Sequence, residues 1–155
     1  MADSPAPTLD FVFSIRVAVS APIETGCIDG KRRRCIPITG GSIDGPRLQG
    51  VVMPLGSDWQ TIDSEGVTEL DARYAITASD GTIIEVRNRG VRVASPDVSD
   101  MLARGEPVDP ALYYFRTTPR FTVPAGPHEW LRRTLFVGAG LRRPDHVLIR
   151  IYAVG

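Results

Sequence analysis

Hydrophobic and polar residues alternate along residues 9–19 in the clearest pattern of the chain. A period of two places every second side chain on the same face of an extended strand. The pattern therefore predicts a long strand buried on one side. Its apolar face would carry Leu9, Phe11, Phe13, Ile15, Val17 and Val19, and its polar face Asp10, Ser14 and Arg16.

Two hairpins are predicted by Asp-Gly pairs. Residues 68–76 alternate between apolar and polar side chains, and an Asp-Gly pair follows at residues 80–81. This dipeptide is typical of two-residue hairpin turns, so residues 82–93 are the expected partner strand. The Asp-Gly pair at residues 29–30 predicts another hairpin. Further strands are expected at residues 36–39, 47–53, 113–118, 121–123, 135–139 and 146–154, and short helices at residues 97–104 and 128–133.

Glycine and proline separate these segments. The chain has 15 glycines and 13 prolines among its 155 residues, and they are dense between Cys35 and Gln60, where strands are expected to bend. Eight to ten short strands with such punctuation predict an all-β fold, and closing the sheet removes its exposed edges. We expect a single domain over residues 1–155. It would be a closed antiparallel β-barrel of the calycin or lipocalin kind, with one or two short helices and a flexible leader at residues 1–8.

The overall charge and hydropathy argue against some classes of partner. The chain carries 18 basic and 18 acidic residues, so its net charge of zero gives no reason to expect nucleic acid or a membrane surface as partner. Without a membrane-length apolar run or a secretory signal pattern, a cytoplasmic location is expected. A reducing compartment favours free thiols at Cys27 and Cys35, although a hairpin could place them opposite each other.

The sequence carries no cofactor motif, so we expect neither a cofactor nor a bound metal ion. Gly40 and Gly41 lack the strand–loop–helix context of a nucleotide site. His128 and His146 have no metal-ligand spacing. The basic run at residues 31–34 is interpreted as a solvated hairpin tip rather than a phosphate site.

Several spaced motifs resemble one known family. They are IPITGG, GP, GSDWQ, LDARYAI, DG, NRG, YYFRTTPRF and HEWL, read in order between about residues 9 and 152. Together they resemble the domain of unknown function 3237 family, small uncharacterised proteins of bacteria and fungi. The resemblance implies a β-barrel and brings no established reaction with it.

Asp58 and Trp59 are the first candidate site residues. They are expected just after a strand end, at the barrel rim. A carboxylate partly desolvated beside an indole has a raised pKa and suits general acid or base work. The alternative is a turn carboxylate that caps backbone N–H groups, with the indole as packing.

Polar side chains predicted to face the interior form the second set. Tyr74 shares a face with Leu70 and Ile76, and Asn88 belongs to the partner strand of the same hairpin. A phenol and an amide inside an apolar barrel need hydrogen-bond partners. A ligand could supply them, as could mutual bonding or a buried water.

Tyr114, Arg116 and Trp130 complete the candidates. If Arg116 points inward it must meet a carboxylate, either of the protein or of a substrate, and Tyr114 shares its face. The pair could clamp a substrate carboxylate or enolate, or Arg116 could form a structural ion pair. Trp130, on a predicted short helix, could be a lid or a packing plug at one barrel end.

These residues suggest a cofactor-independent enzyme of isomerase, hydratase or lyase type acting on a small organic molecule. Asp58, Tyr74 and Arg116 would be catalytic, and Trp59, Asn88, Tyr114 and Trp130 would bind the substrate. A carrier of a small apolar ligand is the first alternative, and it needs a mostly apolar lining. A filled barrel acting as a structural or oligomerisation module is the other, and a homodimer is the assembly to expect in either case.

Overall fold

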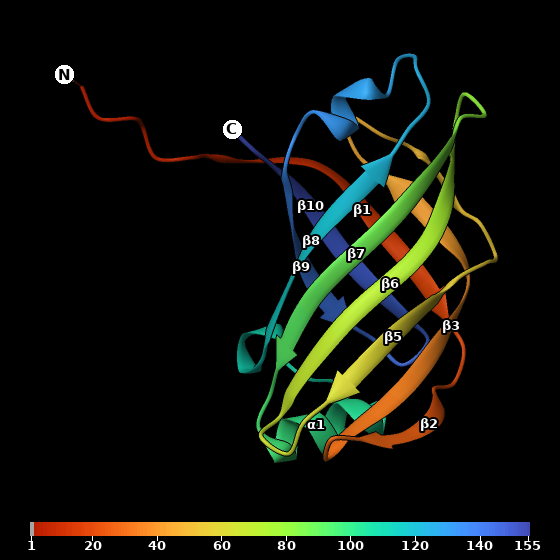
Figure 1. Ribbon diagram of the computed structural model, residues 1–155, viewed down its shortest axis with the longest axis vertical. Helices are drawn as coiled ribbons and strands as arrows, with labels where there is room; N and C mark the ends of the chain where they lie inside the picture. The colour runs from red at the N-terminus through yellow and green to blue at the C-terminus, as the bar shows by residue number, and fades with distance from the viewer. Residues whose placement is uncertain (1) are drawn as a thin grey trace.

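The structure, a computed structural model, describes residues 2–155 (Figure 1). Strands dominate this range, and short helical segments interrupt them. The strands are β1 (Leu9–Val19), β2 (Ile23–Ile28), β3 (Lys31–Asp44), β4 (Gly50–Val52), β5 (Ser57–Ile62), β6 (Val67–Ala78), β7 (Ile83–Val93), β8 (Tyr114–Thr122), β9 (Phe136–Arg142) and β10 (His146–Val154). The helical segments are α1 (Pro96–Ala103), η1 (Pro110–Leu112) and η2 (Glu129–Arg132).

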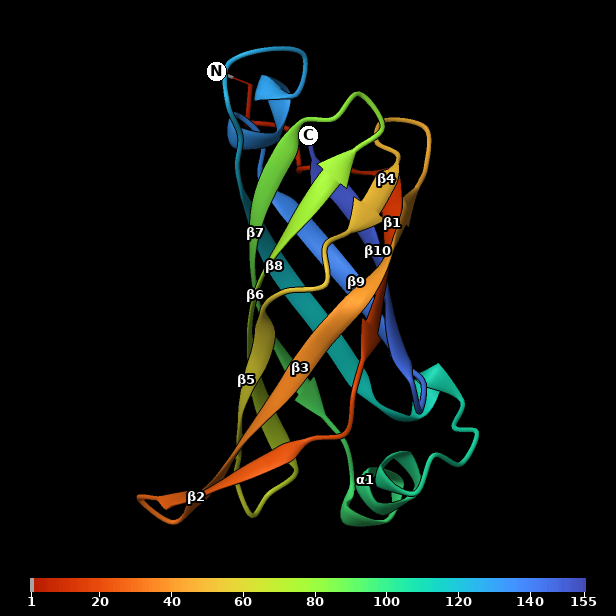
Figure 2. The ribbon, with the colours of Figure 1, turned by 90° about the vertical axis from the view of Figure 1, so that its right-hand side faces the viewer.

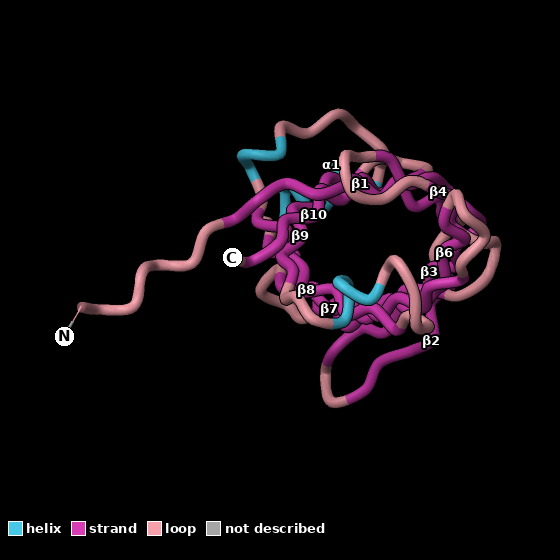
Figure 3. Tube along the Cα trace, turned by 90° about the horizontal axis from the view of Figure 1, so that it is seen from above, coloured by secondary structure: helices cyan, strands magenta, loops and turns pink. Residues whose placement is uncertain are grey.

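The strands pair antiparallel into one sheet that closes on itself. The order runs β1-β10-β9-β8-β7-β6-β4-β3, and an additional pairing of β3 with β1 joins its two ends. β4 and β5 both lie between β3 and β6, and β2 extends as a hairpin from β3. Seen end-on, the strands form a closed ring (Figure 3). The predicted closed antiparallel β-barrel is confirmed, with eight strands in the barrel and two extra strands.

The long strand β3 closes the barrel. One edge of β3 pairs first with β5, through residues 32–37, and then with β4, through residues 41–43. The other edge pairs first with β2 and then, from Ile38 to Asp44, with β1. The register with β1 shifts between Ile38 and Gly40, and the φ angles of Gly40 and Gly41 are 144° and 141°. A Cβ atom at Gly41 would collide with the backbone carbonyl of Arg16. Glycine is therefore required where this strand turns the barrel's corner.

The period-two pattern of β1 is interrupted by a bulge. The register with β10 shifts between Phe11 and Phe13, so Val12 is an extra residue. Phe13 is fully buried, whereas Leu9 and Phe11 are exposed and Phe11 packs edge-on against Tyr152 on the outer surface. The sequence pattern had placed all these apolar residues on one face, because alternation alone cannot show an inserted residue.

Residues 113–118 and 121–123, predicted as separate strands, form the single strand β8. Pro119, which lacks a backbone N–H, lies within this strand. Pro119 nonetheless sits opposite Asn88 in the ladder with β7. The ladder of β8 with β9 joins only Arg116 and Thr117, so it has ended before the proline is reached.

Helical segments lie at opposite ends of the barrel (Figure 2). α1 begins as predicted, with the Ser95 hydroxyl accepting a hydrogen bond from the backbone N–H of Val98. Leu102 of α1 packs with Leu70 and Phe115 in a small apolar cluster at that end. η2 lies at the other end, beside the larger core cluster that includes Leu131.

Two further expectations can be compared with the structure. Cys27 and Cys35 are free thiols, as expected, and their ladder partners are Arg32 and Ile23 rather than each other. Within residues 2–155, no helix has the length and apolar character needed to cross a membrane.

Candidate functional site

Four strands place polar side chains around one cavity inside the barrel. Asp58 of β5, Tyr74 of β6 and Asn88 of β7 line it together with Thr117 of β8. The ladder explains the convergence, because Asp58 and Asn88 both lie opposite Ala72, two residues from Tyr74 on β6. The other lining residues are Val17, Val19, Ile38, Leu70, Ala72, Phe115, Val147 and Ile149. The cavity volume is about 40 Å³.

Asp58 lies inside a strand and not in a turn at the rim, which corrects the sequence interpretation. β5 was not expected, because glycine and proline precede it and its apolar positions are few. Its pairing with β3 puts Asp58 beside Ile36 and directs the carboxylate into the lumen. Trp59, the next residue, points outward and is 44% exposed.

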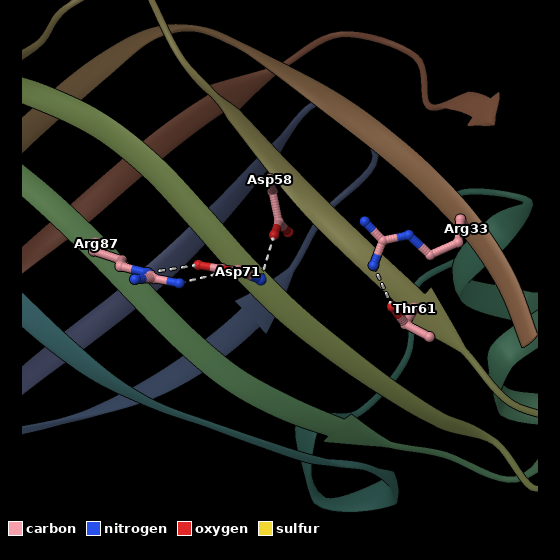
Figure 4. A network of polar contacts seen from close by, with 5 residues as sticks. All are labelled: Arg33, Asp58, Thr61, Asp71 and Arg87. Atoms are coloured by element: carbon pink, nitrogen blue, oxygen red, sulfur yellow. Dashed lines mark hydrogen bonds and ion pairs between the residues drawn. The ribbon is translucent and has the colours of Figure 1, made fainter. Parts of the chain in front are cut away.

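The Asp58 carboxylate is held by two hydrogen bonds. Its Oδ1 accepts from the backbone N–H of Asp71 at 3.1 Å, and its Oδ2 accepts from Gln60 Nε2 at 2.8 Å. Figure 4 shows the first of these contacts, with the Asp71 side chain directed instead to Arg87 on the outer face. The Asp58 carboxylate is therefore fixed in one orientation by donors from β5 and β6.

The environment of Asp58 makes it a weak acid. Although the residue is only partly buried by area, its carboxylate points among apolar side chains. This desolvation raises the pKa of Asp58 to about 6, against the lowering effect of its two hydrogen bonds and of the Arg92 and Arg34 charges. Both protonation states are accessible near neutral pH.

Three neighbours of Asp58 lack protein partners. Tyr74 Oη, Asn88 Oδ1 and Thr117 Oγ1 are buried and have no hydrogen-bond partner among residues 2–155. Burial, followed by the nearby Asp58 charge, raises the pKa of Tyr74, so its phenol stays protonated and can donate. Buried polar groups are nearly always paired, so these atoms are places for a water or a ligand.

The raised pKa of Asp58 makes a testable prediction about stability. The folded state binds the Asp58 proton more tightly than the unfolded state, so the stabilisation is complete below the unfolded pKa of about 3.8 and is lost as pH rises through about 6. Between pH 4 and 7 the wild type should lose about 1–3 kcal/mol relative to Asp58→Asn. Urea unfolding of both proteins across this range measures the difference and removes the contribution of other carboxylates. If the free energies of unfolding of the two proteins changed with pH in parallel, the assigned pKa of Asp58 would be wrong.

A polar chain leads from Asp58 toward the α1 end of the barrel. Gln60 donates to Asp58 and its Oε1 accepts from Arg34 Nε at 2.7 Å. Arg92 and Arg142 also line the interior at that end. The sequence interpretation missed these residues and assigned Arg34 to a solvated hairpin tip. Continuing the strand alternation from Ile36 back to Arg34 would have placed that residue inside.

Comparisons with known proteins agree with the fold. The family model described as "Protein of unknown function (DUF3237)" matches residues 7–154. The chain belongs to the DUF3237 family. An uncharacterised protein of Rhodopseudomonas palustris is 40% identical to this DUF3237 chain over 150 residues, covering 96% of this chain and 98% of its own.

Solved structures resemble this DUF3237 protein along its length. A crystal structure of a conserved protein of unknown function from Rhodopseudomonas palustris has a TM-score of 0.94 at 38% identity, covering 98% of this chain and 100% of its own. A β-barrel-like protein from Acinetobacter baumannii has a TM-score of 0.87 at 33% identity, with full coverage of both chains. A structure described as an enzyme from Penicillium herquei has a TM-score of 0.73 at 20% identity, covering 100% of this chain and 99% of its own, which shows the shared fold alone.

Tyr114 and Arg116 of this DUF3237 protein lie outside the barrel, so their predicted inward placement is wrong. β8 directs Phe115 and Thr117 inward instead, opposite Arg92 and Gly90 of β7. The Phe115 ring fills the space left by Gly140, where a Cβ would collide with it. Arg116 donates to the carbonyl of Phe115 and lies over the Tyr114 ring, whose residue is 56% exposed.

The outward residues form a separate group. Trp59, Tyr114 and Arg116 all line one groove on the outer surface of the barrel. They cannot touch a molecule in the lumen, so the structure contradicts the catalytic role predicted for Arg116 and the lumenal binding roles predicted for Trp59 and Tyr114.

Trp130 packs at the η2 end of the barrel. Its ring meets Phe13 and Phe136 edge-on, and the Arg47 guanidinium lies 3.7 Å from its centroid. Trp130 therefore plugs this end and takes no part in the cavity around Asp58. Within residues 2–155, no group of three or more His, Cys, Asp or Glu residues could hold a metal ion.

Proposed function

We propose that this DUF3237 protein is a cofactor-independent enzyme that transfers a proton on a small organic substrate inside the barrel. The supporting observation is a carboxyl group with a pKa near 6 that shares one cavity with unpaired polar side chains. A titratable group shifted toward neutral pH by burial in a cavity is the usual property of a general acid or base. Isomerisation, hydration or elimination would all fit.

Each residue of the cavity has a distinct part in this proposal. The Asp58 carboxylate takes a proton from a substrate carbon next to a carbonyl group, and the electron pair moves onto the carbonyl oxygen. Tyr74 donates a hydrogen bond to that oxygen, where negative charge develops, and Asn88 orients the substrate. Asp58 then returns the proton to the substrate, so the enzyme ends unchanged. The fold is compatible with catalysis, since the similar barrel from Penicillium herquei is described as an enzyme.

The cavity must widen before a substrate can enter. Its volume of about 40 Å³ accommodates a water molecule, whereas ligand pockets usually measure about 300–1,000 Å³. Several lining side chains are apolar and carry no hydrogen bonds, so their rotation breaks no polar contact. The proposal thus includes a rearrangement of the lumen on binding.

Proton exchange with solvent tests the proposal without knowledge of the product. Small ketones, enones and 2-oxo acids are incubated with the protein in D₂O, and deuterium at the carbon next to the carbonyl is followed by NMR. We expect exchange of at least one compound, with a rate that rises as pH increases through about 6 because the base form of Asp58 is required. A pH-independent rate in this range would contradict the role of Asp58.

A carrier function is the alternative that the apolar lining favours. Eight of the twelve residues around the cavity are apolar, as in proteins that hold an apolar ligand. The small volume also fits a filled barrel that serves as a structural module. Ligand binding without proton exchange would favour the carrier, and neither binding nor exchange would favour the filled barrel.

A further inference from the structure

Three arginines point into the end of the barrel that α1 covers. They come from different strands, Arg34 from β3, Arg92 from β7 and Arg142 from β9, and all line one pocket of about 100 Å³. Arg34 is 7% exposed and Arg92 is 8% exposed. Thr68 of β6 and Ser99 of α1 add hydroxyl groups to the same pocket. This pocket is lined by groups that donate hydrogen bonds, not by the apolar side chains around Asp58.

The positive charges of these arginines are not neutralised by the protein. None of the ion pairs found among residues 2–155 includes Arg34, Arg92 or Arg142. Arg34 Nε is bonded to the neutral Gln60 side chain, and Arg142 Nε is buried without any partner. A buried guanidinium without a counter-ion is strongly destabilising unless something outside the chain pairs with it.

The other charged groups around the pocket do not cancel this excess of positive charge. Arg32 lines it as well, but its guanidinium pairs with Glu24 at 3.2 Å. Asp100 of α1 is an exposed carboxylate at the pocket. Asp58 is hydrogen-bonded to Arg34 only through Gln60, and its charge raises the pKa of all three arginines. Two carboxylates, one of them exposed and the other protonated in part near pH 6, do not balance three guanidinium groups.

Mutual repulsion within the cluster is consistent with this charge excess. Burial, followed by the Arg142 charge, lowers the pKa of Arg92 to about 9 and that of Arg34 to about 10. Burial likewise lowers the pKa of Arg142. Burial and repulsion thus disfavour the charged forms, and a bound anion would relieve both effects.

We propose that Arg34, Arg92 and Arg142 bind the carboxylate of a small amphipathic organic acid. Guanidinium groups match the planar, two-oxygen geometry of a carboxylate, and the pocket has room for one such group but not for a nucleotide. The apolar part of the acid would extend toward the cavity of Asp58. Arg92 lies four residues from Asn88 along β7, about 13 Å in an extended strand, which sets the length an acid would need to reach both places.

Anion binding by the three arginines and catalysis by Asp58 are independent proposals. Binding of an acid by the arginines does not depend on proton transfer, whereas the identification of this acid as the substrate rests on the proposed function. In that case the exchangeable carbon would lie next to a carbonyl several atoms from the carboxylate.

Thermal unfolding with matched probes tests the anion site. Hexanoate, its uncharged analogue hexanamide, and inorganic phosphate are added at constant ionic strength and pH 7.5. We expect hexanoate to raise the unfolding midpoint by about 5–10 °C at 100 times its Kd, and hexanamide to leave it unchanged. Stabilisation by phosphate without hexanoate would overturn the assignment to an organic acid, and stabilisation by neither would overturn the site.

Substitutions of the arginines test whether they cause the shift in the unfolding midpoint with hexanoate. Arg92→Met and Arg142→Met should each abolish the shift caused by hexanoate. Each should also raise the midpoint of the unliganded protein, because a buried unpaired charge is replaced by an apolar side chain of similar length. Arg89→Met is the matched control, since Arg89 lies on the same strand as Arg92 but is exposed on the outer face, and it should keep the full shift.

Two results distinguish failure of the site from failure of the proposed function. Asp58→Asn should still be stabilised by hexanoate, since Asp58 is not among the anion ligands. If Arg92→Met retains the hexanoate shift, the site assignment is wrong whatever the exchange experiment shows. If it loses the shift but proves less stable than wild type without ligand, the arginines are structural partners and the site is likewise rejected.

Discussion

Asp58→Asn is expected to lower the rate of proton exchange by about 10²–10⁴-fold, because positioned acid–base groups usually contribute a factor of this size. The asparagine side chain has nearly the same shape, but its amide cannot accept the proton in this pH range. Its Oδ1 can still accept from either Gln60 or the Asp71 backbone, so the lumen should keep its geometry. The initial rate of deuterium uptake, measured for any compound that exchanges with wild type, gives the ratio.

Asp71→Asn is the control for this substitution. Asp71 donates to Asp58 only through its backbone N–H, which the substitution keeps, and its carboxylate pairs with Arg87 on the outer surface. It should exchange at the wild-type rate, with only a small loss of stability from an exposed ion pair. Wild-type exchange in Asp58→Asn would remove the acid–base role, whereas equal losses in both variants would indicate a general effect on the fold.

Gly41→Ala should destabilise the protein by about 3–5 kcal/mol. Two effects combine, because φ at Gly41 is 141° and the new Cβ would collide with the carbonyl of Arg16. Both strands at this contact are part of the barrel closure, so neither can move away without breaking the pairing of β1 with β3. Urea unfolding monitored by tryptophan fluorescence measures the loss, and a variant that does not fold agrees with the upper end of the range.

Gly26→Ala separates the two effects. Gly26 also has a positive φ, 115°, but a Cβ atom there meets nothing within 4 Å. We expect it to lose only about 1–2 kcal/mol from backbone strain. Equal losses in the two variants would show that the close approach of β3 to β1 does not limit residue 41.

Strand positions were predictable where alternation is uninterrupted. Residues 146–154 coincide with β10, and the hairpin around Asp80-Gly81 pairs β6 with β7 as expected. β5 was missed because its six residues are partly polar, and polar residues are tolerated there only because they face a shared lumen. A short sequence cannot show that requirement, since it arises from strands distant in the chain.

The candidate site was predictable only in part, for a related reason. Tyr74 and Asn88 were placed inside by the face they share with apolar neighbours, and the structure agrees. Tyr114 and Arg116 were assigned to the wrong face because both faces of β8 carry aromatic and polar residues, so the sequence pattern does not show which face points inward. Arg92 shares the inward face of β7 with Ile84, Val86 and Asn88, so the same alternation could have predicted its burial.

Thr8 and Gly155 lie side by side at one end of the barrel, and this has a practical consequence. The backbones of Thr8 and Gly155 exchange two hydrogen bonds at the barrel end that carries η2 (Figure 2). A short peptide could thus join residue 155 to residue 8, and a circularly permuted chain could open instead in the exposed turn at Asp29. Attachment of the protein to a support through either terminus would leave the opposite mouth, beside α1, facing the solution.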